Sequence, residues 1–333
     1  MIISRTPLRM SFAGGGSDLP AYYQEFGGAV VSAAINQYVY VNVNQKFDEG
    51  IRVGYSKNEE VAHTAQIVHP LVRNALQFLK IAGGIEITTI ADIPSSGTGL
   101  GSSSTFTVGL LHALQEYLGR KVDASTLAEQ ACHIEIDLCG EPIGKQDQYA
   151  AAFGGLNFME FLPSGAVKVS PIACSAQTVQ SLQENLLMFY TGKTRSASEL
   201  LLEQSELLGR DTQKQQTMHQ MVQLARNLRD ALESNHPDAI GEILHEGWVL
   251  KKSLVSGISE QEIDRHYALA LSAGAMGGKI LGAGAGGFLL FYAPVERHEA
   301  IKRALAHLKP VEVAFDTLGS QIIFNEKIAS LSS

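Results

Sequence analysis

A stretch of glycine and serine at residues 94–104, Pro-Ser-Ser-Gly-Thr-Gly-Leu-Gly-Ser-Ser-Ser, has the residue types that bind an anion such as phosphate. Because glycine has no Cβ, Gly97, Gly99 and Gly101 let the backbone curl closely around a phosphate chain. The serines at 102–104 add hydroxyls for a phosphate oxygen or for Mg²⁺. A flexible surface loop or a serine-capped helix start is the alternative, but a cap needs only one serine.

Two flanking elements must position this loop. Residues 85–90, Ile-Glu-Ile-Thr-Thr-Ile, alternate and are rich in β-branched side chains, which predicts a strand. The leucines after residue 105 recur at helical spacing and predict a helix. A loop between the two elements would present backbone N–H groups at the positive end of the helix, where an anion is favoured.

A second glycine group, Gly14-Gly15-Gly16-Ser17-Asp18, follows a predicted strand near the N-terminus. Three successive glycines allow the backbone to approach a ligand, and the aspartate places a carboxylate beside it. A tight turn with a capping aspartate explains the same residues equally well. Ser17 or Asp18 is expected to cap a helix that contains Tyr22 and Tyr23.

Asp147 lies in the polar segment Gly-Lys-Gln-Asp-Gln-Tyr at 144–149. Taken by itself, it is better explained as a helix-start aspartate than as a reactive group. Upstream, a helix is predicted from about residue 125 with Leu127 and Ile134 on its apolar stripe. Glu135 lies beside this stripe, so it is expected at the border between core and solvent.

Four cations in the second half are candidate anion ligands. Lys193 and Arg195 follow a buried-type strand at 186–190, with glycine and hydroxyls around them, although solvated loop charges explain them equally. Lys251 and Lys252 lie near the only tryptophan, and one of the two could reach a substrate phosphate. A solvated helix face is the safer interpretation for either lysine.

A third glycine segment, at 279–293, contains Gly282, Gly284 and Gly287 in the spacing of the GxGxxG dinucleotide fingerprint. That fingerprint must open a helix, whereas Phe-Leu-Leu-Phe-Tyr at 288–292 predicts a strand. The segment is therefore expected to be a loop between two strands that lies against another glycine loop or a ligand.

Composition limits the class of protein. The 333 residues suffice for two domains, and 45% hydrophobic with 18% charged residues is typical of a globular chain. A net charge of −8 argues against nucleic-acid and membrane-surface partners. Three cysteines without CxxC spacing suit a reducing compartment, and no signal-peptide or membrane-spanning run is evident, so a cytoplasmic location is expected.

The three glycine motifs, in this order, resemble the signature set of the GHMP small-molecule kinases, which include galactokinase, homoserine kinase and mevalonate kinase. Pro7-Leu8-Arg9 with residues 14–18 matches the first motif, 94–104 the second and 279–287 the third. The second motif, with its Gly-Leu-Gly-Ser-Ser core, is the most specific. The first, from Thr6 to Pro20, is most similar to family members that phosphorylate D-glycero-D-manno-heptose 7-phosphate at the anomeric carbon.

The resemblance implies an α+β fold of two domains with the site in the cleft between them. An N-terminal domain of mixed strands and helices, which binds the ATP phosphates, is expected over residues 1–175. A C-terminal ferredoxin-like domain is expected over 176–333. The predicted elements agree, because strands and helices mix irregularly without a regular βαβα series.

The resemblance also implies roles for individual residues, with ATP and Mg²⁺ as cofactors. Asp147 would accept the proton of the anomeric hydroxyl, and Arg9 would support that aspartate and the transferring phosphoryl group. Ser103 and Glu135 would hold Mg²⁺. The ATP phosphates would be bound by Pro94, Gly97, Gly99, Leu100, Gly101, Ser102, Ser103 and Ser104. The acceptor would be bound by Gly15, Gly16, Ser17, Asp18, Lys193, Arg195, Gly284 and Gly286.

Two alternatives remain at this level. One is a kinase of another sugar of the fucose or galactose type, and the other is a catalytically silent sugar or nucleotide sensor on the same fold. Retention of both Glu135 and Asp147 favours an active enzyme. The expected partners are ATP and a sugar phosphate, without nucleic acid or membrane, and with a homodimer as an open option.

Overall fold

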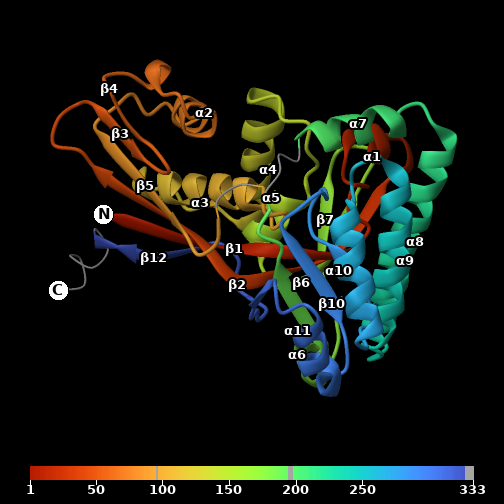
Figure 1. Cartoon of the computed structure of the whole chain (residues 1–333). Coiled ribbons are helices and arrows are strands. Elements are labelled where there is room, and N and C mark those ends of the chain that lie inside the picture. The colour runs from red at the N-terminus through yellow and green to blue at the C-terminus, as the bar shows by residue number, and fades with distance from the viewer. Residues whose placement is uncertain (95–96, 194–197, 327–333) are drawn as a thin grey trace.

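The computed structural model describes residues 1–94, 97–193 and 198–326, and they form two sheets with helices packed around them (Figure 1). The first half of the chain comprises β1 (Ile2–Ala13), α1 (Pro20–Phe26), β2 (Gly28–Gln45), β3 (Ile51–Gly54), β4 (Asn58–Val61), the 3₁₀ turn η1 (Thr64–Gln66), α2 (Pro70–Phe78), β5 (Ile85–Ala91), α3 (Ser102–Tyr117), α4 (Ala124–Cys132), the π-helix η2 (His133–Leu138), α5 (Gln146–Phe153), β6 (Leu156–Phe161) and β7 (Val167–Pro171).

The second half is richer in helix. It comprises α6 (Ala176–Glu184), β8 (Leu186–Tyr190), α7 (Ser198–Leu208), α8 (Thr212–Glu233), α9 (Ala239–Leu254), α10 (Gln261–Ser272), β9 (Gly277–Ile280), β10 (Phe288–Tyr292), the 3₁₀ turn η3 (Val295–Arg297), α11 (His298–Ala304), β11 (Lys309–Val311) and β12 (Gln321–Asn325).

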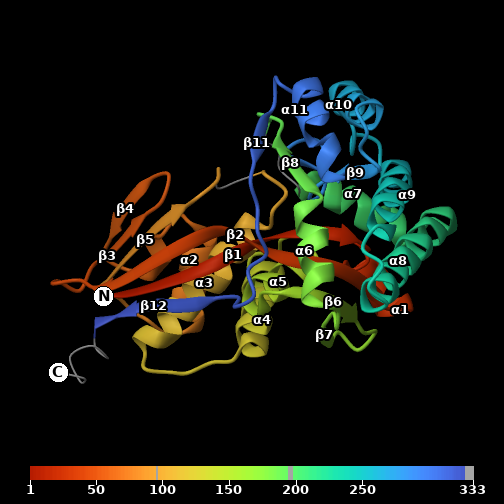
Figure 2. The ribbon, with the colours of Figure 1, turned by 90° about the horizontal axis from the view of Figure 1, so that it is seen from below.

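The first sheet is built around the long strands β1 and β2, which pair antiparallel. In the described residues it has eight strands, in the order β12-β1-β2-β5-β3-β4, with β6 and β7 continuing from β2. β12 arrives from the other end of the chain to pair with β1, as Figure 2 shows. The last strand therefore belongs to the first sheet, and the boundary expected after residue 175 stays a prediction.

Helix α3 lies across this sheet and packs on β1 and β2 (Figure 1). Its leucines at 110, 111 and 114 are completely buried, because the helical spacing of apolar residues turns them toward the sheet. The strand expected at 85–90 and the helix after the glycine loop are both confirmed, as β5 and α3. The glycine loop is thus anchored by β5 before it and by α3 after it.

The second sheet has the antiparallel order β11-β8-β10-β9 among the described residues. Helices α8 and α9 pack on each other, and α9 packs on β9. β9 and β10 are paired antiparallel on either side of the third glycine motif, so the strand expected after Gly287 is confirmed. The α+β class is confirmed as well. No helix among the described residues is long and apolar enough to cross a membrane.

Candidate active site

A cleft of about 900 Å³ is lined by residues from both halves of the chain. The first half contributes β1, the loop after it, β5, α3 and the start of α5, and the second half contributes α7, α9 and β9 with the loop that follows. The charged side chains that line it are Arg9, Asp18, Glu141, Asp147, Lys251 and Lys279. Residues that are far apart in sequence therefore share one cavity.

The N-terminus of α3 opens on this cleft. Gly101 precedes the helix in a left-handed conformation with φ 75°, and no side chain caps the helix. Of the expected phosphate-binding residues, Gly97, Gly99, Gly101 and the three serines at 102–104 line the cleft. Such an uncapped helix start favours an anion.

The remaining two residues expected in the phosphate loop lie outside the cleft lining. Pro94 is exposed, whereas Leu100 is completely buried and its carbonyl oxygen accepts a hydrogen bond from the backbone N–H of Arg9 at 3.2 Å. Residues 95 and 96 fall outside the described residues. Leu100 therefore fastens the loop to β1.

The third glycine motif packs directly on the second. A Cβ added to Gly282 would overlap Gly99 Cα, and one added to Gly287 would overlap the carbonyl of Thr98. Gly284 lines the cleft. Gly286 instead packs against the backbone of Lys193. Gly99 and Gly282 approach each other so closely because neither residue has a Cβ.

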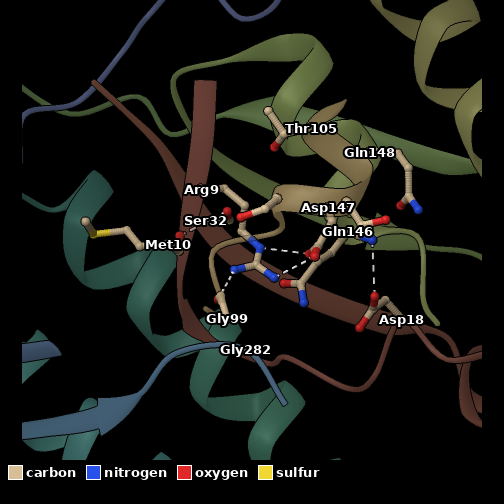
Figure 3. Close-up of polar contacts among 12 residues, drawn as sticks. Arg9, Met10, Asp18, Ser32, Gly99, Thr105, Gln146, Asp147, Gln148 and Gly282 are labelled. Atoms are coloured by element: carbon tan, nitrogen blue, oxygen red, sulfur yellow. Dashed lines mark hydrogen bonds and ion pairs between the residues drawn. The ribbon is translucent and has the colours of Figure 1, made fainter. Parts of the chain in front are cut away.

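Arg9 and Asp147 form a bidentate ion pair in the cleft (Figure 3). Arg9 Nε donates to Asp147 Oδ1 and Nη2 donates to Oδ2, both at 2.7 Å. Arg9 Nη1 donates to the carbonyl of Gly99 at 2.7 Å. One guanidinium thus positions the carboxylate against the phosphate loop, and each carboxylate oxygen keeps a lone pair for a further donor.

Asp18 does not cap the following helix, contrary to expectation. Helix α1 begins at Pro20 and has no side-chain cap. Asp18 Oδ1 accepts from Gly16 N at 3.0 Å, and Oδ2 accepts from Gln146 N at 3.1 Å (Figure 3). Burial raises the pKa of the Asp18 carboxyl. The aspartate therefore joins the first glycine loop to the helix that carries Asp147.

The other residues expected around the acceptor separate into two groups. Gly15 and Gly16 line the cleft. Ser17 is buried, and its Oγ donates to Ala29 O at 3.1 Å, so it supports the loop from behind.

Glu135 is completely buried, which corrects the expectation that it borders solvent. It lies in the π-helix η2, where Ser103 Oγ donates to Oε1 at 3.0 Å and Gln148 Nε2 donates to Oε2 at 2.6 Å. Burial raises the pKa of the Glu135 carboxyl to about 7, although hydrogen bonds from Ser104, Gln148 and Ser103 lower it. Among the described residues no cationic side chain is bonded to Glu135, and a buried carboxylate beside a hydroxyl fits a hard cation such as Mg²⁺.

Of the cations expected to bind a substrate phosphate, only Lys251 is found in the cleft lining among the described residues. Lys193 is half-exposed, pairs with Glu262 at 2.5 Å and Glu260 at 3.4 Å, and does not line the cleft. Arg195 lies outside the described residues. Lys252 pairs with Asp264 at 3.0 Å, and its ammonium lies 5.7 Å from the centroid of the Trp248 ring. Lys251, one residue earlier, lines the cleft.

The sequence did not predict that Lys279 lines the cleft. It is the first residue of the third glycine motif and lies in β9, where all four residues are buried, so no alternation of polar and apolar residues indicates where its side chain points. Lys251 and Lys279 are 7% and 6% exposed. Burial, and then the nearby Arg9, lower the pKa of the Lys251 ammonium to about 7. Burial and the charges of Lys251 and Arg9 also lower the pKa of Lys279.

Lys251→Met is expected to stabilise the protein near neutral pH. The pKa of Lys251 falls from 10.5 to about 7 on folding, so the unfolded chain binds more protons between these values and stability rises with pH across that window. At neutral pH the folded protein must bury the Lys251 ammonium or deprotonate it, and either costs free energy. Methionine removes this cost and should raise the free energy of unfolding by on the order of a few kcal/mol at about pH 7, and by less near pH 10.

Urea unfolding at the two pH values measures this difference. Lys252→Met is the matched control, because its ammonium is partly exposed, pairs with Asp264 and lies over the Trp248 ring. Both contacts are weak at such a position, so its removal should change stability by about 1 kcal/mol or less at either pH. A Lys251→Met protein that is less stable than wild type at neutral pH would contradict the burial argument.

An aromatic wall in the cleft lining was not foreseen from sequence. Tyr55, His69 and Phe106 line the cleft, with ring centroids 4.8 Å apart for Tyr55 and His69 and 5.3 Å apart for His69 and Phe106. His69 Nδ1 is buried and has no hydrogen-bond partner among the described residues. Such a wall can stack a planar ring and offer it one polar atom.

Sequence comparison identifies the class of protein that this fold and cleft define. The chain belongs to the GHMP kinases: residues 62–155 match the GHMP kinases N terminal domain, and residues 228–309 match the GHMP kinases C terminal domain. It is 32% identical over 314 residues to the D-glycero-alpha-D-manno-heptose 7-phosphate kinase of Campylobacter jejuni, covering 90% of this chain and 92% of that one. The chain is therefore a sugar kinase, a phosphotransferase with an alcohol acceptor.

Two further relatives extend this comparison. The crystal structure of a D-glycero-D-manno-heptose 1-phosphate kinase from Bacteroides thetaiotaomicron superposes with a TM-score of 0.80 at 29% identity, covering 98% of this chain and 99% of that one. A bifunctional fucokinase/GDP-fucose pyrophosphorylase of Arabidopsis thaliana is 27% identical over 86% of this chain and 29% of its own length.

Proposed function

We propose that the protein transfers the γ-phosphoryl group of ATP, with Mg²⁺, to the anomeric hydroxyl of D-glycero-D-manno-heptose 7-phosphate. The product would be the 1,7-bisphosphate, for nucleotide-activated heptose synthesis. The observation that carries this proposal is the Arg9–Asp147 pair, which places a carboxylate beside an uncapped helix N-terminus in one cleft. The heptose relative supports the choice of sugar.

The chemistry follows from these positions. The N-terminus of α3 would bind the ATP phosphates, and the aromatic wall of Tyr55, His69 and Phe106 would receive the nucleobase. A carboxylate oxygen of Asp147 would take the proton of the acceptor hydroxyl as the oxygen bonds to the γ-phosphorus. The bond between that phosphorus and ADP breaks, and ADP leaves. Arg9, which stays cationic, would hold Asp147 in place and offset negative charge on the phosphoryl group.

Ser103 and Glu135 would hold the Mg²⁺ ion that accompanies ATP. When bound, the ion neutralises charge on the nucleotide phosphates. Ser103 contributes a hydroxyl at the first turn of α3, and Gln148 keeps the Glu135 carboxylate oriented through the opposite oxygen. The proposed Mg²⁺ ligands thus lie next to the loop that would bind the ATP phosphates.

Ser103→Ala is expected to raise the Mg²⁺ concentration needed for half-maximal activity by roughly tenfold, since one ligand is lost while the carboxylate stays. The measurement is a Mg²⁺ titration of ADP release at fixed ATP. Ser253→Ala, at an exposed position on α9, is the control and should titrate like wild type. Coincident titration curves for all three proteins would remove Ser103 from metal binding.

The substrate is tested by ADP release from the purified enzyme with the heptose 7-phosphate, fucose, galactose and their phosphates. Turnover of the heptose 7-phosphate above all other acceptors is the expected result. A preference for fucose would favour the alternative that the fucokinase relative suggests. Binding of sugar or ATP without any ADP release would favour a silent sensor.

We also propose that the enzyme acts in the cytoplasm on small-molecule partners. Cys132, Cys139 and Cys174 are free thiols, which suits a reducing compartment. The negative net charge of −8 favours small-molecule partners over nucleic acid. Whether the enzyme is a homodimer is decided by sedimentation of the purified protein.

A further inference from the structure

Two buried lysines in the cleft have no function in the mechanism above. Lys251 on α9 donates from Nζ to the carbonyl of Gly282, and Lys279 on β9 donates from Nζ to Phe12 O at 3.4 Å. Both are more than nine-tenths buried and line the cleft. The ion pairs formed by the described residues include neither of them. Buried ammonium groups without a carboxylate are rare, because nothing in the protein offsets their desolvation.

Both lysines lie close to Arg9. Lys251 contacts Gly282, which packs on Gly99, and the Gly99 carbonyl accepts from Arg9 Nη1. Lys279 reaches the backbone of β1 three residues after Arg9, at the strand end that leads into the first glycine loop. The positive charges of Arg9 and Lys251 help to lower the pKa of Lys279. Three basic side chains therefore line the same cleft, and Asp147 is the one carboxylate among the described residues that forms an ion pair with any of them.

We propose that Lys251 and Lys279 form a phosphate subsite distinct from the N-terminus of α3. A phosphate group carries up to two negative charges and several acceptor oxygens, and it matches two desolvated ammonium groups better than a singly charged anion does. The inference rests on the proposed function, since the phosphate comes from one of the two reactants. It is either the phosphate already present on the acceptor sugar or the phosphoryl group in transfer.

The acceptor's own phosphate is the expected occupant. In the mechanism proposed above, Arg9 and the helix N-terminus would contact the phosphoryl group in transfer. Among the described side chains that line the cleft, Lys251 and Lys279 are the remaining lysines or arginines. The subsite would therefore select a phosphorylated sugar over the same sugar without phosphate.

Direct binding of inorganic phosphate tests the subsite without any assumption about the sugar. Calorimetry on the full-length enzyme should show that Lys251→Met and Lys279→Met each raise the Kd for inorganic phosphate by about tenfold. Lys252→Met, the adjacent surface lysine, should leave the Kd unchanged. Equal Kd values for wild type and both cleft variants would overturn the proposal. Thermal unfolding of each variant verifies that it is folded.

Steady-state kinetics separate the two sources of phosphate. If the subsite holds the acceptor's phosphate, each cleft variant should raise KM for the heptose 7-phosphate by about tenfold or more, with KM for the unphosphorylated heptose unchanged. If it holds the phosphoryl group in transfer, kcat should fall equally for both acceptors. Lys251→Arg should recover part of either loss, because it restores the charge. Variants with wild-type KM and kcat on both acceptors would contradict the proposal.

The two proposals can fail separately. A wild-type enzyme that turns over neither heptose, but whose phosphate binding depends on Lys251 and Lys279, refutes the proposed substrate and supports the subsite. An enzyme that turns over the heptose 7-phosphate with unchanged kinetics in both variants refutes the subsite and supports the proposed substrate.

Discussion

Replacing Asp147 with asparagine is expected to lower kcat by about a hundredfold or more, the scale of a general base. The amide oxygen can accept one of the two hydrogen bonds from Arg9, whereas the amide nitrogen is itself a donor and loses the other. The amide cannot take the proton of the acceptor hydroxyl, however. A hundredfold loss corresponds to about 2.7 kcal/mol of transition-state stabilisation.

The assay is ADP release at saturating ATP and sugar phosphate, with KM values measured alongside. Because the loss is confined to the chemical step, KM for ATP should stay within a few-fold of wild type. Asp137→Asn, an exposed aspartate that pairs with His133 on η2, is the control and should have wild-type kcat. If a folded Asp147→Asn enzyme turned over as fast as wild type, Asp147 would not be the base.

The contact between the two glycine loops is expected to be the most sensitive packing position. In Gly282→Ala, the new Cβ would overlap Gly99 Cα and approach the Gly99 carbonyl oxygen to 2.9 Å. That carbonyl accepts from Arg9 Nη1, so relief of the clash would also displace the group that positions Asp147. We expect a loss of stability of roughly 2–5 kcal/mol, from left-handed strain of about 1–2 and overpacking of about 1–3.

Gly119→Ala provides the matched control. Gly119 has φ +73°, against +72° for Gly282, but a Cβ there would meet nothing within 4 Å. Both variants should carry the strain of a left-handed alanine, and only Gly282→Ala should carry the overlap. Urea unfolding measures the difference in stability, and kcat/KM for ATP should fall by at least about tenfold in Gly282→Ala alone. Equal stability and equal kinetics in the two variants would show that the loops separate without cost.

Several local features could be predicted because they depend on residues close together in the chain. The strand β5, the glycine loop and helix α3 follow from alternation, glycine content and helical periodicity between residues 85 and 117. The rejection of a dinucleotide site at Gly282, Gly284 and Gly287 followed from the apolar run behind it, which forms β10. In each case backbone preference and side-chain period determine the structure within a few residues.

The Arg9–Asp147 ion pair could not be predicted from local pattern alone. The resemblance to the family predicted that Arg9 and Asp147 act together, whereas Asp147 by itself indicated only the start of a helix. The two residues are 138 positions apart, and only the packing of α5 against β1 makes them a bidentate pair. The same holds for Asp18, whose cap was predicted from its neighbours but whose carboxylate instead accepts from Gln146 N, 128 residues away.

The burial of charged groups was decided by the tertiary structure alone. Glu135 was placed at a solvent border from its position beside an apolar stripe, but η2 is a π-helix and packs against α2, α3 and α4, so the carboxylate is enclosed. Lys251 and Lys252 are adjacent in sequence, yet only Lys251 faces the cleft. The sequence by itself determined the glycine loops, the elements that flank them and the family. Which charges are desolvated, and so which can act on a phosphate, depends on contacts between distant segments that no local period encodes.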